Sequence, residues 1–321
     1  MEQKRLTAGF ILRRVVRGFL GTQSADAAAG LSFYGLLAMF PTLIAAFSVI
    51  GLFGEKRGAA RAVLDALGEV LAPDTIDALR EPIQAVAKAS GAGWVLVVSL
   101  TVALWSVARY ITALGHAMNR IYGVPEGRPL WKAKPVHLLL TAVVFVLVLA
   151  AAGLAAISWP LAQFIGAQIG AGETALTVWR VLRWPAVVLL VMLVIALLYY
   201  FAPNVQHPRF RWISIGAAIA LLVLALASTG FAFYVSRLAD YDRVYGSFAG
   251  VVILLLWLWI ANMALLVGAL FDAEIERARE LKVGEPAERS IQLPLRDTER
   301  IANIARHDVE DERTARRIRE S

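Results

Sequence analysis

The chain has 321 residues, of which 59% are hydrophobic and 18% charged, and its mean hydropathy is +0.63. Soluble domains are about 45–50% apolar even with glycine counted, so this composition excludes an ordinary soluble protein and indicates a membrane protein. The net charge of +7 by itself would suggest a nucleic-acid partner, but the arginines cluster beside apolar runs, which favours membrane orientation. The absence of cysteine excludes disulfides, thiolate nucleophiles and cysteine-ligated metals.

The first 25 residues carry five cations, three of which interrupt the apolar stretch from Leu6 to Leu20. A signal peptide needs an uninterrupted apolar core, so we predict that this segment is retained. Apolar side chains interleaved with arginines are typical of a helix that lies on an anionic membrane surface. Residues 1–25 are therefore predicted to form a cytoplasmic amphipathic segment.

Six apolar, almost uncharged runs follow, each of roughly the 20 residues that a helix needs to cross a bilayer. Connections rich in cations alternate with poorer ones in the first half of the chain, which places both termini in the cytoplasm. The predicted fold class is all-α, a polytopic membrane protein with a six-transmembrane-helix bundle over residues 26–275. The predicted spans are about 27–53, 94–114, 136–158, 181–201, 212–235 and 246–271.

Two polar segments flank these spans. Residues 54–92 repeat apolar side chains at helical spacing on both sides of Pro73, which predicts two amphipathic helices in the first outer loop. Such helices could dock partner proteins of the cell envelope. Residues 276–321 mix acids and bases and contain few apolar side chains. We predict a short helical extension to about Lys282, followed by a largely disordered cytoplasmic tail.

The last span is the one that most clearly expects neighbours. Gly246 and Gly250 lie four residues apart, which allows another helix to approach the backbone closely. Asn262 falls near the middle of the run, where an amide has no water to bond and needs a protein partner. The span is therefore predicted to pack inside a helix bundle.

Polar side chains within or beside the spans are the candidate cavity or lipid-contact residues. Arg109 is the most unusual of them, because a cation inside a span is costly unless it is paired or snorkels to the interface. One hypothesis pairs it inside the bundle with Asp26 or with the region of Asn119; the alternatives are that Asp26 caps its helix and that Arg109 snorkels. The full set is Asp26, Tyr34, Arg109, Asn119, Asn204, Tyr234, Tyr241, Tyr245 and Asn262.

Enzyme signatures are missing from the sequence. The four histidines are scattered and lack the spacing of a zinc site, and no nucleotide-binding or serine-hydrolase motif is present. The acidic residues Asp308, Glu310, Asp311 and Glu312 lie among arginines, which is typical of a solvated charge run rather than a magnesium site. We therefore predict no enzyme activity, no metal, no cofactor and no nucleic-acid partner.

Several stretches resemble the BrkB/YihY family of bacterial inner-membrane proteins over about residues 10–275. The resemblance implies six transmembrane helices and a role in envelope integrity and in lipid or lipopolysaccharide handling. Many members carry the label ribonuclease BN, which no catalytic constellation in this sequence supports. The stretches are AAAGLSFYGLLAMFP at 27–41, LWSVARYITALGHAMNRIYG at 104–123, RPLWK at 128–132, APN at 202–204 and YGS at 245–247, together with Tyr234 and Tyr241.

One stretch departs from the family. Members commonly read GAELNAE where this chain reads GALFDAE, so that Leu270 stands in place of a glutamate and Asp272 in place of an asparagine. Any role of that glutamate is therefore not expected here.

Two functions from different classes follow from these features. The first is transport or export of a lipid-like amphiphile, because polar groups are expected at two depths of the bundle. The second is a scaffold for envelope assembly that does not transport, with residues 54–92 as its docking surface. An intramembrane enzyme is a third and weaker alternative. Membrane lipids are the expected partners in the first case.

Overall fold

The computed structural model describes residues 8–52, 80, 92–156, 162, 172–206, 214–237 and 245–320. This part of the chain is all-helical apart from an isolated bridge between Val205 and Leu295, which confirms the predicted all-α class. The predicted amphipathic helices of residues 54–92 lie outside the described residues, as does Tyr241. The helices are α1 (Ala8–Gly21), α2 (Ser24–Leu52), α5 (Ala92–Tyr122), α6 (Leu130–Ala156), α8 (Glu173–Phe201), α9 (Ile215–Arg237), the 3-10 helix η1 (Gly246–Phe248), α11 (Ala249–Val283) and α12 (Glu299–Glu320).

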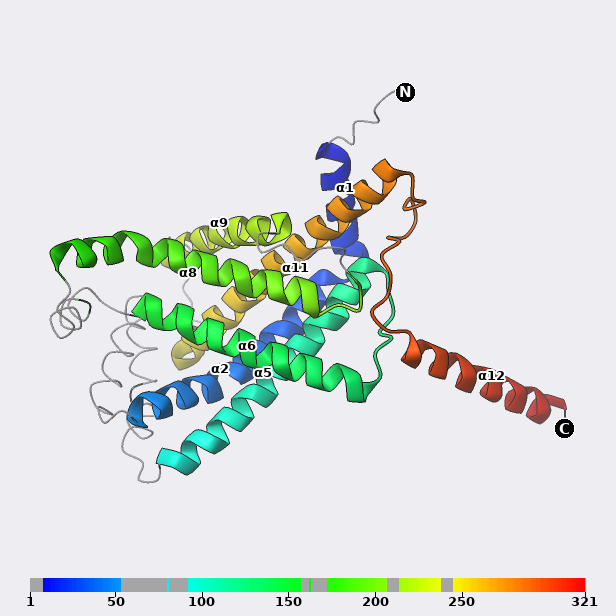
Figure 1. Ribbon diagram of the computed structural model, residues 1–321, viewed down its shortest axis with the longest axis horizontal. Coiled ribbons are helices and arrows are strands. Elements are labelled where there is room, and N and C mark those ends of the chain that lie inside the picture. The colour runs from blue at the N-terminus through cyan, green and yellow to red at the C-terminus, as the bar shows by residue number, and fades with distance from the viewer. Residues whose placement is uncertain are drawn as a thin grey trace.

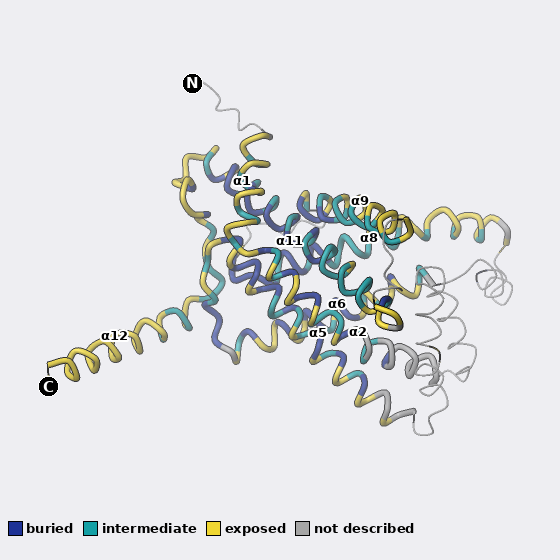
Figure 2. The backbone as a smooth tube through the Cα atoms, turned by 180° about the vertical axis from the view of Figure 1, so that it is seen from behind, coloured by how far each residue is buried: buried dark blue, intermediate teal, exposed yellow. Residues whose placement is uncertain are grey.

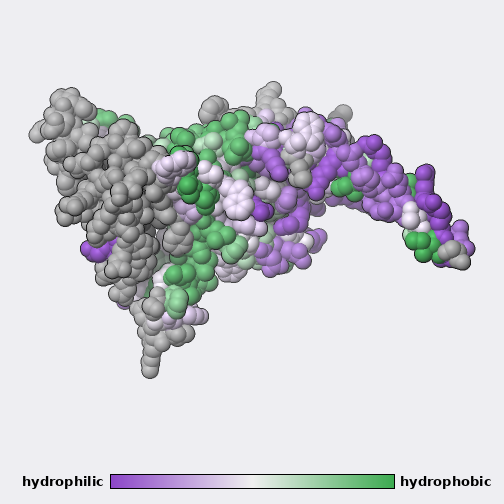
Figure 3. Space-filling view, turned by 90° about the horizontal axis from the view of Figure 1, so that it is seen from below, coloured by the Kyte–Doolittle hydropathy of each residue, from purple (hydrophilic) through white to green (hydrophobic). Residues whose placement is uncertain are grey.

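Five described helices are long and apolar enough to cross a membrane, namely α5, α6, α8, α9 and α11. Each coincides with one of the predicted spans, and several extend well beyond the predicted ends. The remaining predicted span, 27–53, coincides with α2, a helix of 29 residues whose one charged side chain is Asp26. Figure 3 shows apolar side chains gathered in the middle of the molecule and hydrophilic ones at the end that carries α12.

α11 is the helix around which the others are arranged (Figure 1). It packs against α9, α2, α1 and α5, while α2 packs most extensively on α5, and α6 joins α8 to α5. Trp259 of α11 donates its indole N–H to the carbonyl of Ala25 at 3.1 Å, which ties α11 to the start of α2.

The closest helix contact runs through Gly216 of α9 and Gly268 of α11. A Cβ on either glycine would overlap the backbone oxygen of the other, so both positions require glycine. The predicted close approach at Gly246 is wrong, because a Cβ there would meet nothing within 4 Å. Gly246 instead has φ +52 and forms the turn at η1. Small residues do mark a close helix contact, but this contact is at Gly268, about six helical turns after Gly246.

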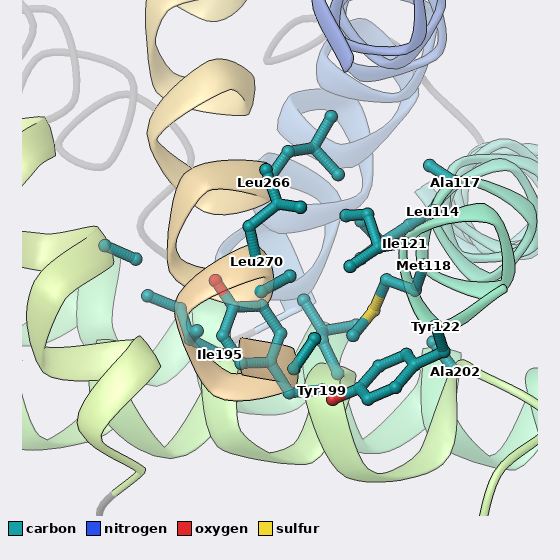
Figure 4. Close-up of a cluster of buried hydrophobic side chains, with 14 of the residues drawn as sticks. Leu114, Ala117, Met118, Ile121, Tyr122, Ile195, Tyr199, Ala202, Leu266 and Leu270 are labelled. Carbon is teal, nitrogen blue, oxygen red and sulfur yellow. The ribbon is translucent and has the colours of Figure 1, made fainter. Parts of the chain in front are cut away.

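Most of the apolar core lies at one end of the bundle, and a smaller cluster of Ala45, Ala103 and Phe145 lies between α2, α5 and α6. Leu114 and Met118 of α5, Tyr199 of α8, and Leu266 and Leu270 of α11 are all buried at that end and point toward one another (Figure 4). Burial is much sparser toward the other end (Figure 2). In α9 the buried residues are confined to the first two turns, and in α11 all but one of them lie at or after Asn262. The bundle is therefore tightly packed at the end where both termini lie.

The segment after α11 corrects the prediction of a largely disordered tail. α11 ends at Val283, close to the predicted end, and Gly284 follows with φ +90 as a left-handed helix cap. Ala287 and Ile291 are buried, and α12 is a regular helix of 22 residues with no buried residue. Two apolar side chains and a set of backbone hydrogen bonds hold residues 284–300 against the bundle. We call these residues the C-terminal strap.

α1 is helical as the sequence predicts. Val15 is buried against α11, and Arg14 forms an ion pair with Glu274 at 2.7 Å. Leu12 and Val16 on the other side of the helix are exposed, next to Arg13. One side of α1 is thus fixed to the bundle, and its contact with a membrane surface stays a prediction.

Candidate functional site

Asn204 lies at the centre of a buried polar node at the packed end of the bundle. Its backbone N–H donates to the side-chain oxygen of Asn119 at 2.7 Å. Its side-chain amide donates to the carbonyls of Pro125 at 3.2 Å and Asp297 at 3.0 Å, and its side-chain oxygen accepts the N–H of Asp297 at 3.2 Å. One fully buried asparagine therefore joins the end of α5, the turn after α8 and the C-terminal strap. Asn119 and Asn204, two of the predicted site residues, are in direct contact.

A buried ion pair supports this node from the α5–α6 connection. Arg128 donates to both carboxylate oxygens of Glu126 at 2.8 Å and to the carbonyl of Ala202 at 2.7 Å. Glu126 also accepts a hydrogen bond from Asn119 at 2.9 Å. Burial by itself would raise the pKa of Glu126, but the hydrogen bonds and charge of Arg128 outweigh burial and lower that pKa. Glu126 is therefore a charged, fully partnered acid.

A second arginine reaches the same helix end from the strap. Arg296 donates to the carbonyl of Tyr200 at 2.6 Å and to that of Val205 at 2.8 Å, and its guanidinium lies 5.0 Å from the Tyr200 ring centre. Burial lowers the pKa of Arg296. The last carbonyls of a helix have no partner within it and carry partial negative charge. Arg128 and Arg296 supply those partners to α8 from two segments far apart in the chain.

Gly127 lets the strap approach the α5–α6 connection. A Cβ at this position would overlap the carbonyl oxygen of Asp297, and the Gly127 carbonyl accepts the N–H of Arg300 at 2.9 Å. Lys132 adds ion pairs to Asp297 at 3.0 Å and Glu299 at 2.7 Å. The backbone N–H of Glu299 and the Lys132 ammonium lower the pKa of Asp297. The strap therefore closes over the node through backbone and charge together.

A second polar cluster lies inside the bundle. Tyr110 of α5 donates to the side-chain oxygen of Asn262 of α11 at 2.7 Å. The amide nitrogen of Asn262 donates to Ser32 of α2 at 3.3 Å and to the carbonyl of Leu258 at 2.9 Å. The partner predicted for Asn262 is thus confirmed, and this triad joins three helices. Tyr34 lies two residues beyond Ser32 and packs edge-on against Phe33, with ring centres 5.7 Å apart.

The predicted pairing of Arg109 with Asp26 or Asn119 is wrong. Arg109 is exposed, and its guanidinium lies 5.2 Å from the ring centre of Trp105 on the same helix. Asp26 is exposed in the first turn of α2, where its charge complements the helix dipole. The reason is helical phase: Tyr110, one residue on, faces the interior, which turns Arg109 outward. Asn119 is occupied by Glu126 and Asn204 instead.

The remaining predicted tyrosines do not join either cluster. Tyr234 and Tyr245 are both exposed, one near the end of α9 and the other just before η1. These positions lie at the opposite end of α11 from Asn204. The two sets of polar residues that were predicted at different depths therefore lie at opposite ends of the bundle.

An acid on α11 that was not among the candidates anchors α9. Asp272 accepts hydrogen bonds from the hydroxyl of Ser214 and from the N–H of Gly216, the latter at 2.8 Å, at the start of that helix. Its proximity to Gly216 was not visible in the sequence, because the two residues are 56 positions apart in the chain. Leu270, at the position where the family resemblance implies a glutamate, is buried in the apolar core beside Gly18.

Comparison with known proteins assigns the chain to a family. The family model described as "Virulence factor BrkB" matches residues 15–292. The chain belongs to the BrkB family. Its resemblance to BrkB/YihY proteins is thereby confirmed. The family model ends within the strap, so Arg296 and Asp297 lie beyond it.

Curated relatives agree with a membrane protein. A UPF0761 membrane protein from Aromatoleum aromaticum is 29% identical over 284 residues, covering 86% of this chain and 67% of that protein. One from Chromobacterium violaceum is 29% identical over 282 residues, covering 86% of this chain and 64% of that protein. The ribonuclease-like protein YfkH of Bacillus subtilis is 27% identical over 260 residues, covering 80% of this chain and 92% of YfkH. The chain thus spans about two thirds of the length of these UPF0761 relatives. No solved structure matches the chain.

Proposed function

We propose that this protein crosses the bacterial inner membrane six times, with both termini in the cytoplasm, and moves a lipid-like amphiphile between or out of the leaflets. Six spans require the two ends of the chain to lie on one side, and α2 supplies the sixth helix beside the five candidate spans. The first and last described helices, α1 and α12, lie at the same end of the bundle (Figure 1), which supports this arrangement. Most of the cations in the α5–α6 connection and in the strap lie at that end of the bundle.

The uneven packing of the bundle is the observation that carries the transport proposal. At the packed end the polar node and the strap close the bundle over α8, while α9 after Ala220 and α11 between Ala249 and Asn262 have no buried residue. The triad of Tyr110, Asn262 and Ser32 lies between these regions. A bundle closed at one end and loosely packed at the other suits an amphiphile that enters from the lipid phase and meets polar groups at depth.

A scaffold is the second candidate, and α12 is the observation that favours it. This helix has 22 residues, none of them buried, and it projects away from the bundle (Figure 1). A charged helix held at its start by the strap presents all its faces to a partner. In this case α12, besides the predicted helices of residues 54–92, would carry the interaction.

We also propose that the chain is not a ribonuclease. The ribonuclease-like name belongs to YfkH, whereas the UPF0761 relatives are named membrane proteins. Among the described residues no group of three or more His, Asp or Glu side chains could hold a metal ion. His137 is buried beside Thr112 in the bundle, and His307 is exposed on α12, so these two ring systems are far from a common site.

Lipid movement in reconstituted vesicles tests the transport proposal. Purified protein in vesicles with a fluorescent phospholipid should speed the loss of inner-leaflet fluorescence after a membrane-impermeant quencher is added. Replacing Asn262 by Leu removes the buried amide and should slow this movement, whereas Thr229→Ala, an exposed change on α9, should leave it unchanged. Movement no faster than in protein-free vesicles would reject transport and leave the scaffold as the better account.

A further inference from the structure

A single face of α5 changes from apolar to cationic along its length. Measured around the helix at about 100° per residue, seven exposed residues fall within roughly 60° of Arg109. Toward the start of α5 they are apolar, and from Arg109 onward they are two arginines and a histidine. We call this set the α5 stripe; it consists of Trp94, Val98, Val102, Trp105, Arg109, His116 and Arg120.

The two arginines of the α5 stripe face no carboxylate in the part of the chain that the structure describes. Among the described residues no carboxylate forms an ion pair with Arg109 or Arg120, and the guanidinium of Arg109 is held only over the ring of Trp105. Trp105 itself is 62% exposed, so the pair faces away from the bundle. The opposite face of α5 is filled by core side chains such as Ile111, Leu114 and Met118.

Arg109 lies within reach of a membrane interface. Arg109 lies 13 residues before the end of α5 at Tyr122, or roughly 20 Å along the helix axis, and 11 residues before Arg120, or roughly 16 Å. The predicted span 94–114 ends only five residues beyond Arg109, or roughly 8 Å along the axis, which an arginine side chain crosses by snorkelling. The anions that the guanidinium meets there are the phosphates of phospholipids.

We propose that the α5 stripe is a binding site for an anionic phospholipid. The phosphate binds Arg109, Arg120 adds positive charge on the side of the interface, and the acyl chains lie along Trp105, Val102 and Val98. A free phosphate would use the cations but not the apolar half of the stripe. This inference rests on the proposed function in one respect, that the chain lies in a bilayer and handles lipid, and it names the class of that lipid.

A second copy of the chain fits this surface less well. In a symmetric dimer formed through α5, the same face of both copies would meet, and the stripe of one copy would meet that of the other. Cations would then face cations without an acid to neutralise them, which is unfavourable in a medium of low polarity. An anionic lipid neutralises the stripe, and its chains cover the exposed indole rings.

Native mass spectrometry of the purified protein with phosphatidylglycerol tests the site. We expect bound phosphatidylglycerol on the wild type and an affinity about tenfold lower in Arg109→Gln, since a charge-assisted contact to phosphate is lost. Arg109→Lys should keep part of the binding, because the charge remains. Arg237→Gln, an exposed arginine at the end of α9, is the matched control and should bind as the wild type does. Phosphatidylcholine should bind more weakly than phosphatidylglycerol.

Three outcomes would overturn the proposal. Equal binding of phosphatidylglycerol by the wild type and a folded Arg109→Gln variant would exclude Arg109 as a ligand. Complete displacement of the lipid by millimolar inorganic phosphate would assign the site to a free anion. A disulfide-linked dimer of the Val98→Cys variant in membranes would show that protein covers the stripe, and the chain has no other cysteine to confuse this result.

The test separates this inference from the proposed transport. If phosphatidylglycerol binds through Arg109 but vesicles show no lipid movement, the transport proposal fails and the site stands. If lipid moves at the wild-type rate in an Arg109→Gln variant that binds phosphatidylglycerol normally, the site fails and transport stands.

Discussion

Asn204 holds Asp297 through a reciprocal pair of hydrogen bonds: its side-chain oxygen accepts the Asp297 N–H at 3.2 Å, and its side-chain nitrogen donates to the Asp297 carbonyl at 3.0 Å. The amide thus pairs with the strap as a neighbouring β-strand would, from a residue 93 positions away. Since Asn204 is fully buried, no water replaces these bonds when the side chain is removed. The node therefore makes the strap part of the folded bundle.

Asn204→Ala should release the strap and destabilise the protein. Three side-chain hydrogen bonds are lost and buried backbone groups are left without partners, which costs about 2–4 kcal/mol. Limited trypsin digestion in detergent should cut the strap at Arg296 and Arg300 much faster than in the wild type. Thr229→Ala, an exposed change on α9 whose hydroxyl bonds only within its own helix, is the control and should change the digestion rate little. Equal protection of Asn204→Ala and the wild type would show that the node does not hold the strap.

Gly127→Ala should also displace the strap, but through steric overlap instead of lost hydrogen bonds. The added methyl group would overlap the backbone oxygen of Asp297, which has no flexible side chain to yield. We expect a lower thermal unfolding midpoint and the same faster trypsin cleavage. Gly153→Ala, in a helix position where a Cβ meets nothing within 4 Å, should be neutral or slightly stabilising. An unchanged thermal unfolding midpoint in Gly127→Ala would mean that the strap shifts without loss of stability.

Acid should open the strap. The pKa values of Glu126 and Asp297 are lowered in the folded protein. Both carboxylates therefore stabilise the folded protein at any pH above their unfolded-state pKa values. This stabilisation is lost as the pH falls through their folded-state pKa values. The docking should therefore hold from neutral pH to about pH 5 and weaken below roughly pH 4. A cysteine at the buried Ile291, probed with a disulfide reagent that reacts in acid, reports the opening. Protection that persists at pH 3 would assign the docking to uncharged contacts.

Magnesium or zinc should not make the protein a ribonuclease. We expect no RNA cleavage above a mock preparation, because the acids of α12 lie among arginines on an exposed helix. Robust cleavage that disappears in a variant lacking Asp308, Glu310 and Asp311 would contradict this expectation. Cleavage that survives in that variant would be assigned to a contaminating nuclease.

The bundle was predictable because long uncharged runs have few other stable structures. The five candidate spans follow the predicted ones, and Asn262 was expected to need a partner because an amide deep in an apolar run cannot stay unbonded. Arg109 was misplaced because composition says that a cation lies in the span but not which way it faces. That depends on the helical phase set by Tyr110 and by the core side chains of α5.

The strap could not be predicted, because its stability comes from contacts distant in the chain. The strap has four aliphatic residues in a charged segment, Ala287, Ile291, Leu293 and Leu295, which are too few to signal order by composition. Arg296 is one of many tail arginines until α8 places the carbonyls of Tyr200 and Val205 beside it. The node is therefore a tertiary feature, of which the sequence revealed only Asn119 and Asn204.

The membrane arrangement underlies both the transport proposal and the α5 stripe, and cysteine labelling tests it most directly. Single cysteines at Pro125, Ser290 and Ser236, all exposed, can be labelled without background, because the chain has no cysteine. With an impermeant maleimide on intact spheroplasts, we predict labelling of Ser236→Cys alone, and labelling of Pro125→Cys and Ser290→Cys only after the membrane is permeabilised. Labelling of Pro125→Cys or Ser290→Cys in intact spheroplasts, or protection of Ser236→Cys, would contradict a bundle whose packed end lies in the cytoplasm.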